Sequence, residues 1–245
     1  MTATARESML RDAVAEHTLA FTLEPGTTAL AVIDMQYASA CRTAGFGRWL
    51  EQNGRSPEGA YRFDRIEGML VPNIGRLLAF FREHDQPRLF IRLGAQMVGG
   101  RDLIPHVRSL ERDFRNLHGN REFEFLDKLA PRPGEPVLTK LSVSAFSSTG
   151  IDALLRNLGV HSVVFTGVST SQCVDLTARD AADRGYNSLV VEDAVAEDRA
   201  DFHAWTLEQF QRLFGRVAST DAVIAELSGA LRLERTESNE GEGRA

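Results

Sequence analysis

A single segment, residues 163–174, constrains this chain more than any other: an apolar strand runs into a turn of small residues and then into a helix. Cys173 stands where that helix must begin. The first turn of a helix exposes unpaired N–H groups and the positive end of the helix dipole, which favour a thiolate and can hold a nearby oxyanion. The segment therefore predicts a nucleophilic Cys173, although a free cysteine is more often a small buried hydrophobic residue.

The residues after Cys173 predict a parallel α/β arrangement. Helical spacing and a glycine stop define the helix through Val174, Thr177, Ala178, Ala181, Ala182 and Gly185. Residues 187–192 then form the next strand. In open parallel sheets, ligands bind at the carboxyl ends of strands, which is where Cys173 lies.

Two upstream strands end in charged residues. Residues 28–34 form an apolar strand that ends in Asp34, and residues 136–140 form a shorter strand that ends in Lys140. Because the carboxyl ends of parallel strands share one edge, Asp34, Lys140 and Cys173 can converge. Lysine would stabilise the thiolate and aspartate would move the proton, although singly each charged residue is more often structural.

The remaining elements alternate as a parallel sheet requires. Residues 88–93 form another strand, and residues 66–84, 150–158 and 204–214 are predicted helices. A chain of 245 residues with 43% hydrophobic side chains can bury one large core. We therefore expect one α/β domain with a doubly wound, mostly parallel sheet and helices on both faces.

These motifs resemble the isochorismatase-like cysteine hydrolases. The resemblance is carried by the stretches 33–36, 140–149, 167–174, 177–181 and 184–186. It implies a three-layer, Rossmann-like fold with Asp34, Lys140 and Cys173 as the catalytic triad. It also implies a cis peptide between Val168 and Ser169, an oxyanion hole formed by the N–H groups of Ser169 and Cys173, and assembly as a homodimer or homotetramer.

Within this family, the cysteine favours members that cleave amides and ureides over those that cleave a vinyl ether. Nicotinamidase-like members hold a metal through an Asp-x-His motif and a later histidine after the second strand, where this chain has residues 94–100 and no histidine until His106. The histidines show no ligand spacing: His17, His84, His106, His118, His161 and His203. We expect no metal and no other cofactor.

Candidate substrate contacts lie beside the triad and in a long connection. Residues 36–64 are predicted to be a loop that covers the site, with Tyr37, Phe46, Trp49 and Tyr61 as possible walls of a small pocket. The residues assigned to substrate binding are Gln36, Tyr37, Phe146, Gln172, His203 and Trp205. For Phe146, Gln172, His203 and Trp205 a structural role is an equally good interpretation, and aromatic residues in such a loop are at least as often packing residues. Cys41 has no base or orienting charge nearby in sequence and is not expected to be a second nucleophile.

Charge and composition exclude other classes of protein. The formal net charge of −6 argues against a nucleic-acid surface, and acidic residues lie between Arg108, Arg112 and Arg115. With two cysteines and neither a signal segment nor a long apolar run, we expect a cytoplasmic protein that does not bind a membrane. We assign residues 1–22 to an N-terminal helical extension, 23–231 to the hydrolase domain and 232–245 to a disordered tail.

Three functions remain open from sequence. A cysteine amidohydrolase that cleaves a small amide or ureide through a thioester is favoured by the complete triad. Hydrolysis of a vinyl ether or ester on the same scaffold is the second possibility, and a catalytically idle ligand-binding or redox-sensing protein is the third. The substrate is not fixed, because residues 36–64 and 94–121 match no pattern that would select among carbamoyl amino acids, biuret-like ureides, ureidoacrylate, maleamate and nicotinamide.

Overall fold

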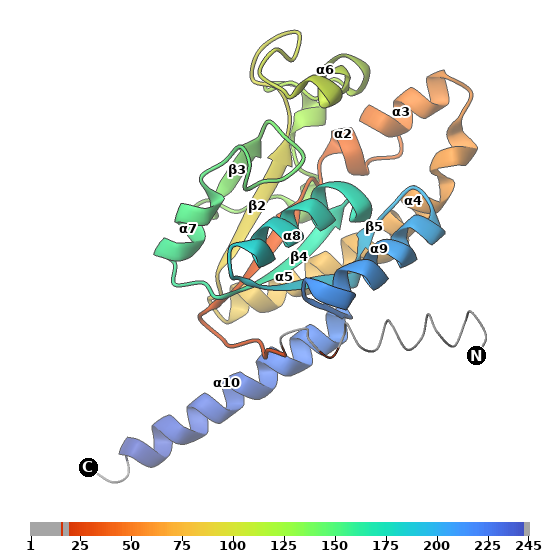
Figure 1. Cartoon of the computed structure of the whole chain (residues 1–245). Helices are drawn as coiled ribbons and strands as arrows, with labels where there is room; N and C mark the ends of the chain where they lie inside the picture. The colour runs from red at the N-terminus through yellow and green to blue at the C-terminus, as the bar shows by residue number, and fades with distance from the viewer. Residues whose placement is uncertain (1–15, 17–19, 243–245) are drawn as a thin grey trace, which may run out of the picture.

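The computed structural model, which describes residue 16 and residues 20–242, contains one six-stranded sheet (Figure 1). Every strand pair is parallel, and the spatial order is β3-β2-β1-β4-β5-β6. The strands are β1 (Thr28–Ile33), β2 (Arg88–Leu93), β3 (Val137–Lys140), β4 (Ser162–Val168), β5 (Asn187–Ala196) and β6 (Arg216–Ala218). The predicted α/β fold with a doubly wound parallel sheet is confirmed.

Helices cover both faces of the sheet, because the side chains of its central strands alternate between two apolar cores. In β1, Leu30 and Val32 face the core that α5 (Val71–Glu83) and α10 (Thr220–Glu242) cover. Ala29, Ala31 and Ile33 face the opposite core, which is covered by α7 (Ile151–Asn157), α8 (Asp175–Asp183) and α9 (Ala200–Leu213). Since β1 lies between β2 and β4 and is buried on both faces, it reads as a continuous apolar run.

The segment 36–64 is helical, and its prediction as a loop was wrong. It contains α2 (Tyr37–Ala40), α3 (Gly45–Gln52), the 3₁₀ turn Ser56–Gly59 and the start of α4 (Ala60–Arg65). These elements are short, and Leu50 and Phe63 bury their side chains against the core of the domain. Tertiary burial stabilises turns that the glycine- and arginine-rich sequence does not mark as helices.

Other boundaries differ less. The predicted helix 66–84 begins with a π-helical turn, Ile66–Leu70, before α5, and β5 continues to Ala196 beyond the predicted end at residue 192. Between β2 and β3 lie α6 (Ser109–Phe114) and three 3₁₀ turns, Pro105–Val107, Arg121–Phe123 and Asp127–Leu129. Arg112 lies in α6 and pairs with Asp113 at the surface, as expected for a solvated helical face.

The C-terminal end of the chain differs from the prediction, and the N-terminal end lies mostly outside the described residues. The predicted N-terminal helix falls almost entirely on residues 1–15 and 17–19, outside the described residues, so the proposed extension 1–22 stays a prediction. At the other end, α10 continues to Glu242, through most of the segment predicted to be disordered. Alanine, leucine, arginine and glutamate in residues 230–234 have high helix propensity and allow the docked helix to propagate beyond its packed part.

One glycine sets the spacing of the strands that carry the site. Gly167 in β4 has φ of 114°, and a Cβ there would lie 1.9 Å from the carbonyl oxygen of Ile33 in β1. Any side chain at this position would therefore push β1 and β4 apart. Asp34 and Cys173 follow these same two strands, so Gly167 keeps their strand ends close together.

Candidate active site

Three strand ends bring Asp34, Lys140 and Cys173 to one edge of the sheet. Asp34 directly follows β1, Lys140 is the last residue of β3, and Cys173 lies in a π-helical turn, Thr170–Val174, between β4 and α8. Asp34 adopts φ of 52°, a left-handed conformation that aspartate tolerates better than most residues. All three side chains are buried, with Lys140 fully enclosed.

Lys140 connects the other two residues. Its Nζ lies 2.8 Å from Asp34 Oδ2 and 3.1 Å from Cys173 Sγ, and it also donates to the carbonyl oxygen of Ser142 at 3.4 Å. An ammonium has three N–H donors, so these contacts account for all of them. Asp34 Oδ1 is buried and receives no hydrogen bond from any residue that the structure describes. That oxygen is therefore free to take a proton or to accept a hydrogen bond from a bound molecule.

Burial decides the resting state of the thiol. Burial, and secondly the charge of Asp34, raise the pKa of Cys173 to about 12, and Lys140 only partly offsets this rise. The pKa of Lys140 is itself raised, because the nearby carboxylate and sulfur outweigh the effect of its burial. At neutral pH the site therefore holds an Asp34–Lys140 ion pair beside a neutral thiol, rather than the preformed thiolate that the sequence suggested. Cys173 then needs a base at the moment of attack, and Asp34 is adjacent.

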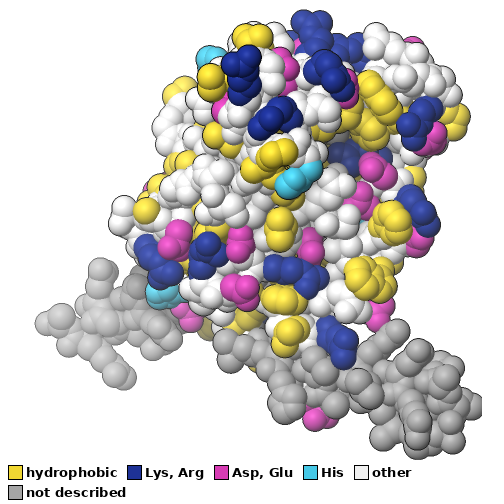
Figure 2. All heavy atoms as spheres, turned by 45° about the horizontal axis from the view of Figure 1, so that its top comes forward, with side chains coloured by type: hydrophobic (Ala, Val, Ile, Leu, Met, Phe, Trp, Pro, Cys, Tyr) yellow, Lys and Arg dark blue, Asp and Glu magenta, His cyan; other side chains and the backbone are white. Residues whose placement is uncertain are grey.

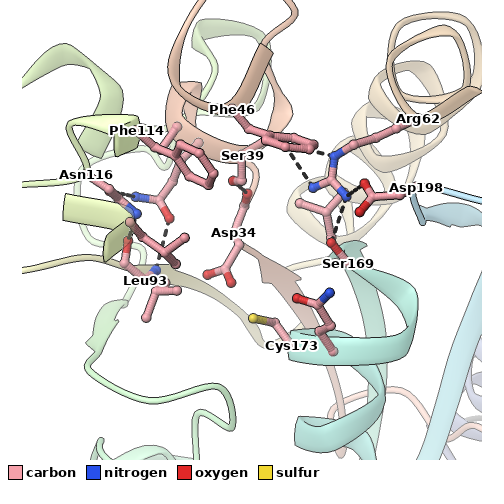
Figure 3. A pocket seen from close by; sticks show the side chains of 15 residues that line it. Asp34, Ser39, Phe46, Arg62, Leu93, Phe114, Asn116, Ser169, Cys173 and Asp198 are labelled. Atoms are coloured by element: carbon pink, nitrogen blue, oxygen red, sulfur yellow. Dashed lines mark hydrogen bonds and ion pairs between the residues drawn. The ribbon is translucent and has the colours of Figure 1, made fainter. Parts of the chain in front are cut away.

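A pocket of about 210 Å³ opens over the cysteine. Figure 3 shows Asp34 and Cys173 facing this space, with Leu93, Phe114 and Asn116 on one side and Arg62, Ser169 and Asp198 on the other. The described residues that line it are Asp34, Gln36, Ala38, Ser39, Phe46, Arg62, Leu93, Leu110, Phe114, Asn116, Val168, Ser169, Gln172, Cys173 and Asp198. The pocket thus combines apolar side chains with placed polar and charged groups, as small-molecule sites do.

Gln36 and Asn116 brace one wall of the pocket. The Gln36 side chain accepts a hydrogen bond from the Leu93 N–H at 3.0 Å and donates to the Phe123 carbonyl at 2.8 Å. It also donates to Asn116 Oδ1 at 3.3 Å, and Asn116 donates in turn to the Leu93 carbonyl. Gln36 therefore contacts the pocket, but its amide group is used to hold the loop after β2 against β1.

The opposite wall is built around a buried arginine from α4. Arg62 Nη1 donates to Ser169 Oγ at 2.7 Å and lies 3.0 Å from Asp198 Oδ1. Its Nε and Nη2 both donate to the Ser39 carbonyl, at 3.2 and 2.9 Å. The guanidinium also lies 5.7 Å from the centre of the Phe46 ring. One side chain thus joins the segment after β1, the turn after β4 and the end of β5.

Of the substrate contacts assigned from sequence, only Gln36 and Gln172 line the pocket. Tyr37 points to the surface, where it bonds with Asp127 and Arg121. Phe146 packs in the core against Tyr186, and Trp205 is 64% exposed on α9. Among the aromatic residues proposed as pocket walls, Phe46 lines the pocket and Trp49 and Tyr61 do not.

His203 has a structural position. It lies on α9, where Nδ1 is 3.0 Å from Thr170 Oγ1 and Nε2 is 3.2 Å from Arg65. Burial, and secondly the charge of Arg65, lower the pKa of His203 to about 4, so its ring is neutral at physiological pH. The histidine thereby holds the turn that carries Cys173 onto α9 without reaching the pocket.

Sequence reasoning did not find Arg62, Asp198 or Asn116. Asp198 carried a usable signal, because it follows a strand end, but the strand was predicted to stop at residue 192. Arg62 and Asn116 stand in segments rich in arginine and polar residues, where nothing in the sequence distinguishes a buried side chain from a solvated one. Cys41 lies outside this pocket, near Thr43.

The groups expected to hold an oxyanion lie beside the cysteine. The Val168–Ser169 peptide bond is cis in this structure, and Ser169 lines the pocket next to Cys173.

Within the described part of the chain, no group of three or more His, Cys, Asp or Glu side chains is arranged to hold a metal. None of the helices described is long and apolar enough to span a membrane. Acidic and basic side chains stand next to each other over the face seen in Figure 2.

Replacing Lys140 with alanine is expected to move the alkylation of Cys173 to higher pH. Removing a cation 3.1 Å from the sulfur destabilises the thiolate, so the pKa of Cys173 rises further. The rate of iodoacetamide labelling against pH, with the labelled peptide identified by mass spectrometry to separate Cys173 from Cys41, measures the change. Lys128→Ala, which alters the chain's other lysine at an exposed position, is the control. An unchanged profile in Lys140→Ala would contradict an electrostatic role for the lysine.

Comparison with known proteins gives a consistent family. A family model described as the isochorismatase domain matches residues 28–222. Over 215 residues the chain is 30% identical to the protein named "Ureidoacrylate amidohydrolase RutB" from Pseudomonas savastanoi pv. phaseolicola, which covers 81% of this chain and 83% of that relative.

Solved structures agree in fold. A cysteine hydrolase from Pseudomonas syringae pv. phaseolicola superposes with a TM-score of 0.69 at 24% identity, covering 87% of this chain and 98% of that one. The N-carbamoylsarcosine amidase from Thermoplasma acidophilum superposes with a TM-score of 0.58 at 27% identity, covering 80% of this chain and 97% of the other.

Proposed function

Because the chain belongs to the isochorismatase family, we propose that it is a cysteine amidohydrolase that cleaves the C–N bond of a small amide or ureide. The observation that carries this proposal is the buried cluster in which Lys140 contacts both Asp34 and Cys173 at the base of a pocket. Relatives named for amidohydrolase and amidase activity support the same class of reaction. Homodimeric or homotetrameric assembly belongs to this proposal as well.

The first half of the reaction forms a thioester. As Cys173 Sγ attacks the substrate carbonyl carbon, the thiol proton passes to Asp34, whose Oδ1 is free to accept it. The N–H groups of Ser169 and Cys173 stabilise the resulting oxyanion. The C–N bond then breaks, the Asp34 proton goes to the departing nitrogen, and ammonia or an amine leaves.

The second half restores the enzyme. Water enters the space that the leaving group vacated. Asp34 removes a proton from this water while the water oxygen attacks the thioester carbon. Collapse of this intermediate expels the sulfur of Cys173, which regains its proton from Asp34. Lys140 keeps Asp34 oriented throughout and lowers the free energy of the thiolate at each moment when the sulfur carries charge.

An ammonia-release screen over small primary amides and ureides tests the proposal, with ureidoacrylate and N-carbamoyl amino acids included because relatives are named for such substrates. Turnover that disappears in Cys173→Ala and persists in Cys41→Ala would support it. Ammonia release that Cys173→Ala leaves intact would reject the assignment of the nucleophile. Ester or vinyl-ether turnover without any amide turnover would place the reaction in the alternative class.

Exhaustive chelation is expected to leave the rate of ammonia release unchanged. The loop after β2, where the resemblance would place an Asp-x-His ligand pair, has the sequence of residues 94–100 without histidine, and the proposed steps need no Lewis acid. Initial rates before and after dialysis against EDTA, with total metal content measured on the same samples, provide the test. A large loss of rate that zinc or manganese restores would contradict the prediction.

A further inference from the structure

The charged side chains that line the pocket already have partners within the chain. Asp34 is paired with the fully buried Lys140 behind it. Arg62, whose side chain is 4% exposed, is paired with Asp198 at 3.0 Å. Among the described residues of the pocket wall these are the ionised groups, and their charges balance.

Arg62 uses four of its five N–H donors in hydrogen bonds within the fold. Its donors go to the Ser39 carbonyl, to Ser169 Oγ and to Asp198 Oδ1, and Phe46 covers one face of the guanidinium. A carboxylate entering the pocket must therefore displace Asp198 or share the arginine with it. Sharing would place two carboxylates on one cation, beside the third carboxylate of Asp34.

The rest of the wall offers little to an additional charge. Phe46, Leu93, Leu110 and Phe114 are apolar, and the amides of Gln36 and Asn116 are used in hydrogen bonds to backbone groups. The remaining polar side chains, Ser39, Ser169 and Gln172, carry no charge. A carboxylate brought into such surroundings loses hydration and gains no unpaired cation in exchange. The free energy of its transfer into the pocket is therefore less favourable than that of a neutral group of similar size. An apolar methyl or ring in the same position gains from burial.

We propose that the substrate is an uncharged small amide or ureide with an apolar body, and that Asp198 excludes carboxylate-bearing analogues by occupying Arg62. The inference rests on the proposed function and narrows it. The reacting carbonyl lies over Cys173, and the apolar body packs toward Phe46, Leu110 and Phe114. Asp198 thus acts as a specificity residue at the pocket wall, while Arg62 positions Ser169.

Two pairs of compounds test this, each differing only by a methyl group in place of a carboxylate: butanamide with succinamate, and propylurea with 3-ureidopropionate. In the unmodified enzyme we expect kcat/KM for the neutral member to exceed that of its partner by about tenfold, because the carboxylate is partly desolvated without gaining an unpaired cation. Higher kcat/KM for the carboxylate members would overturn the inference.

Replacing Asp198 with asparagine is expected to increase activity on the carboxylate compounds. Asparagine keeps an oxygen that can accept from Arg62 Nη1 but removes the competing charge, so the positive charge of Arg62 is no longer neutralised and attracts a substrate carboxylate. We expect the ratio of kcat/KM for each carboxylate member, succinamate or 3-ureidopropionate, to that of its neutral partner to rise by about tenfold. Asp201→Asn, which removes the same charge from an exposed residue outside the pocket, is the matched control and should change neither ratio.

Binding separates this inference from the proposed function. Calorimetric titration of the same four compounds into Cys173→Ala measures recognition without turnover. Tighter binding of the neutral members without ammonia release from any compound by the unmodified enzyme would reject the reaction and keep the charge selection. Turnover confined to the carboxylate members, no measurable binding of any compound, or an unchanged preference in Asp198→Asn would overturn the charge selection.

Discussion

Cys173→Ser is expected to reduce ammonia release by on the order of 10³ to 10⁶-fold, as found when a nucleophile that acts as part of a triad is removed. The hydroxyl of serine is far less acidic than a thiol, and the site lowers the barrier for a sulfur already held 3.1 Å from Lys140 Nζ. The substitution changes one buried atom and adds no bulk, so the fold should be retained.

Initial rates on the best amide from the screen measure this loss, and the melting temperature of each variant reports on folding. Cys41→Ser carries the same change at a partly exposed position outside the pocket and should keep the activity of the unmodified enzyme. Intact-mass measurement during turnover should find an acyl adduct on the unmodified chain and none on Cys173→Ser. A Cys173→Ser enzyme within about tenfold of the original rate would contradict nucleophilic catalysis by the thiol.

Asp34→Asn is expected to reduce turnover by on the order of 10² to 10⁴-fold, the usual contribution of general acid–base catalysis. Asparagine has nearly the same shape as aspartate but cannot take the thiol proton. Because the thiol is neutral at rest, with its pKa raised to about 12, the loss of this base affects the attacking step directly. Asp64→Asn, an exposed change on α4, is the control and should leave turnover unchanged.

Asp34→Asn is also expected to change the pKa of Cys173 in a direction that a merely structural role of Asp34 would not produce. The negative charge of Asp34 helps to raise the pKa of Cys173, so its removal should lower that pKa. The alkylation profile of Asp34→Asn should therefore move to lower pH, opposite to the shift expected for Lys140→Ala. Shifts in the same direction would show that both variants only loosen the site, and a rate near that of the unmodified enzyme would remove Asp34 from the proton transfers.

Much of the site could be predicted because strand ends are local features. The apolar run 28–33 followed by Asp34, and the strand ending in Lys140, can be read directly from the order of residue types. Parallel pairing then places all carboxyl ends at one edge, so two strand ends and one helix start specify a cluster. The structure places these three residues in contact, as that reasoning expected.

The pocket wall was harder to predict for a physical reason. Arg62 belongs to a short helix that forms only because Leu50 and Phe63 are buried nearby, and its own sequence neighbourhood resembles a solvated surface. Tyr37 and Trp205 are aromatic residues close to the triad in sequence or in the family pattern, yet they point away from the pocket. Which way a side chain points in such segments depends on contacts with residues far away in the chain.

By itself, the sequence determined the parallel α/β fold, the order of strands β1 to β5 along the chain and the three residues at their ends, because each follows from periodicity and from residue type at an element boundary. It did not mark the short strand β6. Only the tertiary structure decided that residues 36–64 fold into helices, that Arg62 is buried against Asp198, and that the Cys173 thiol rests protonated. All three features depend on the exclusion of water from the interior, which requires every segment that covers the site. A pattern of neighbouring residue types does not contain that information.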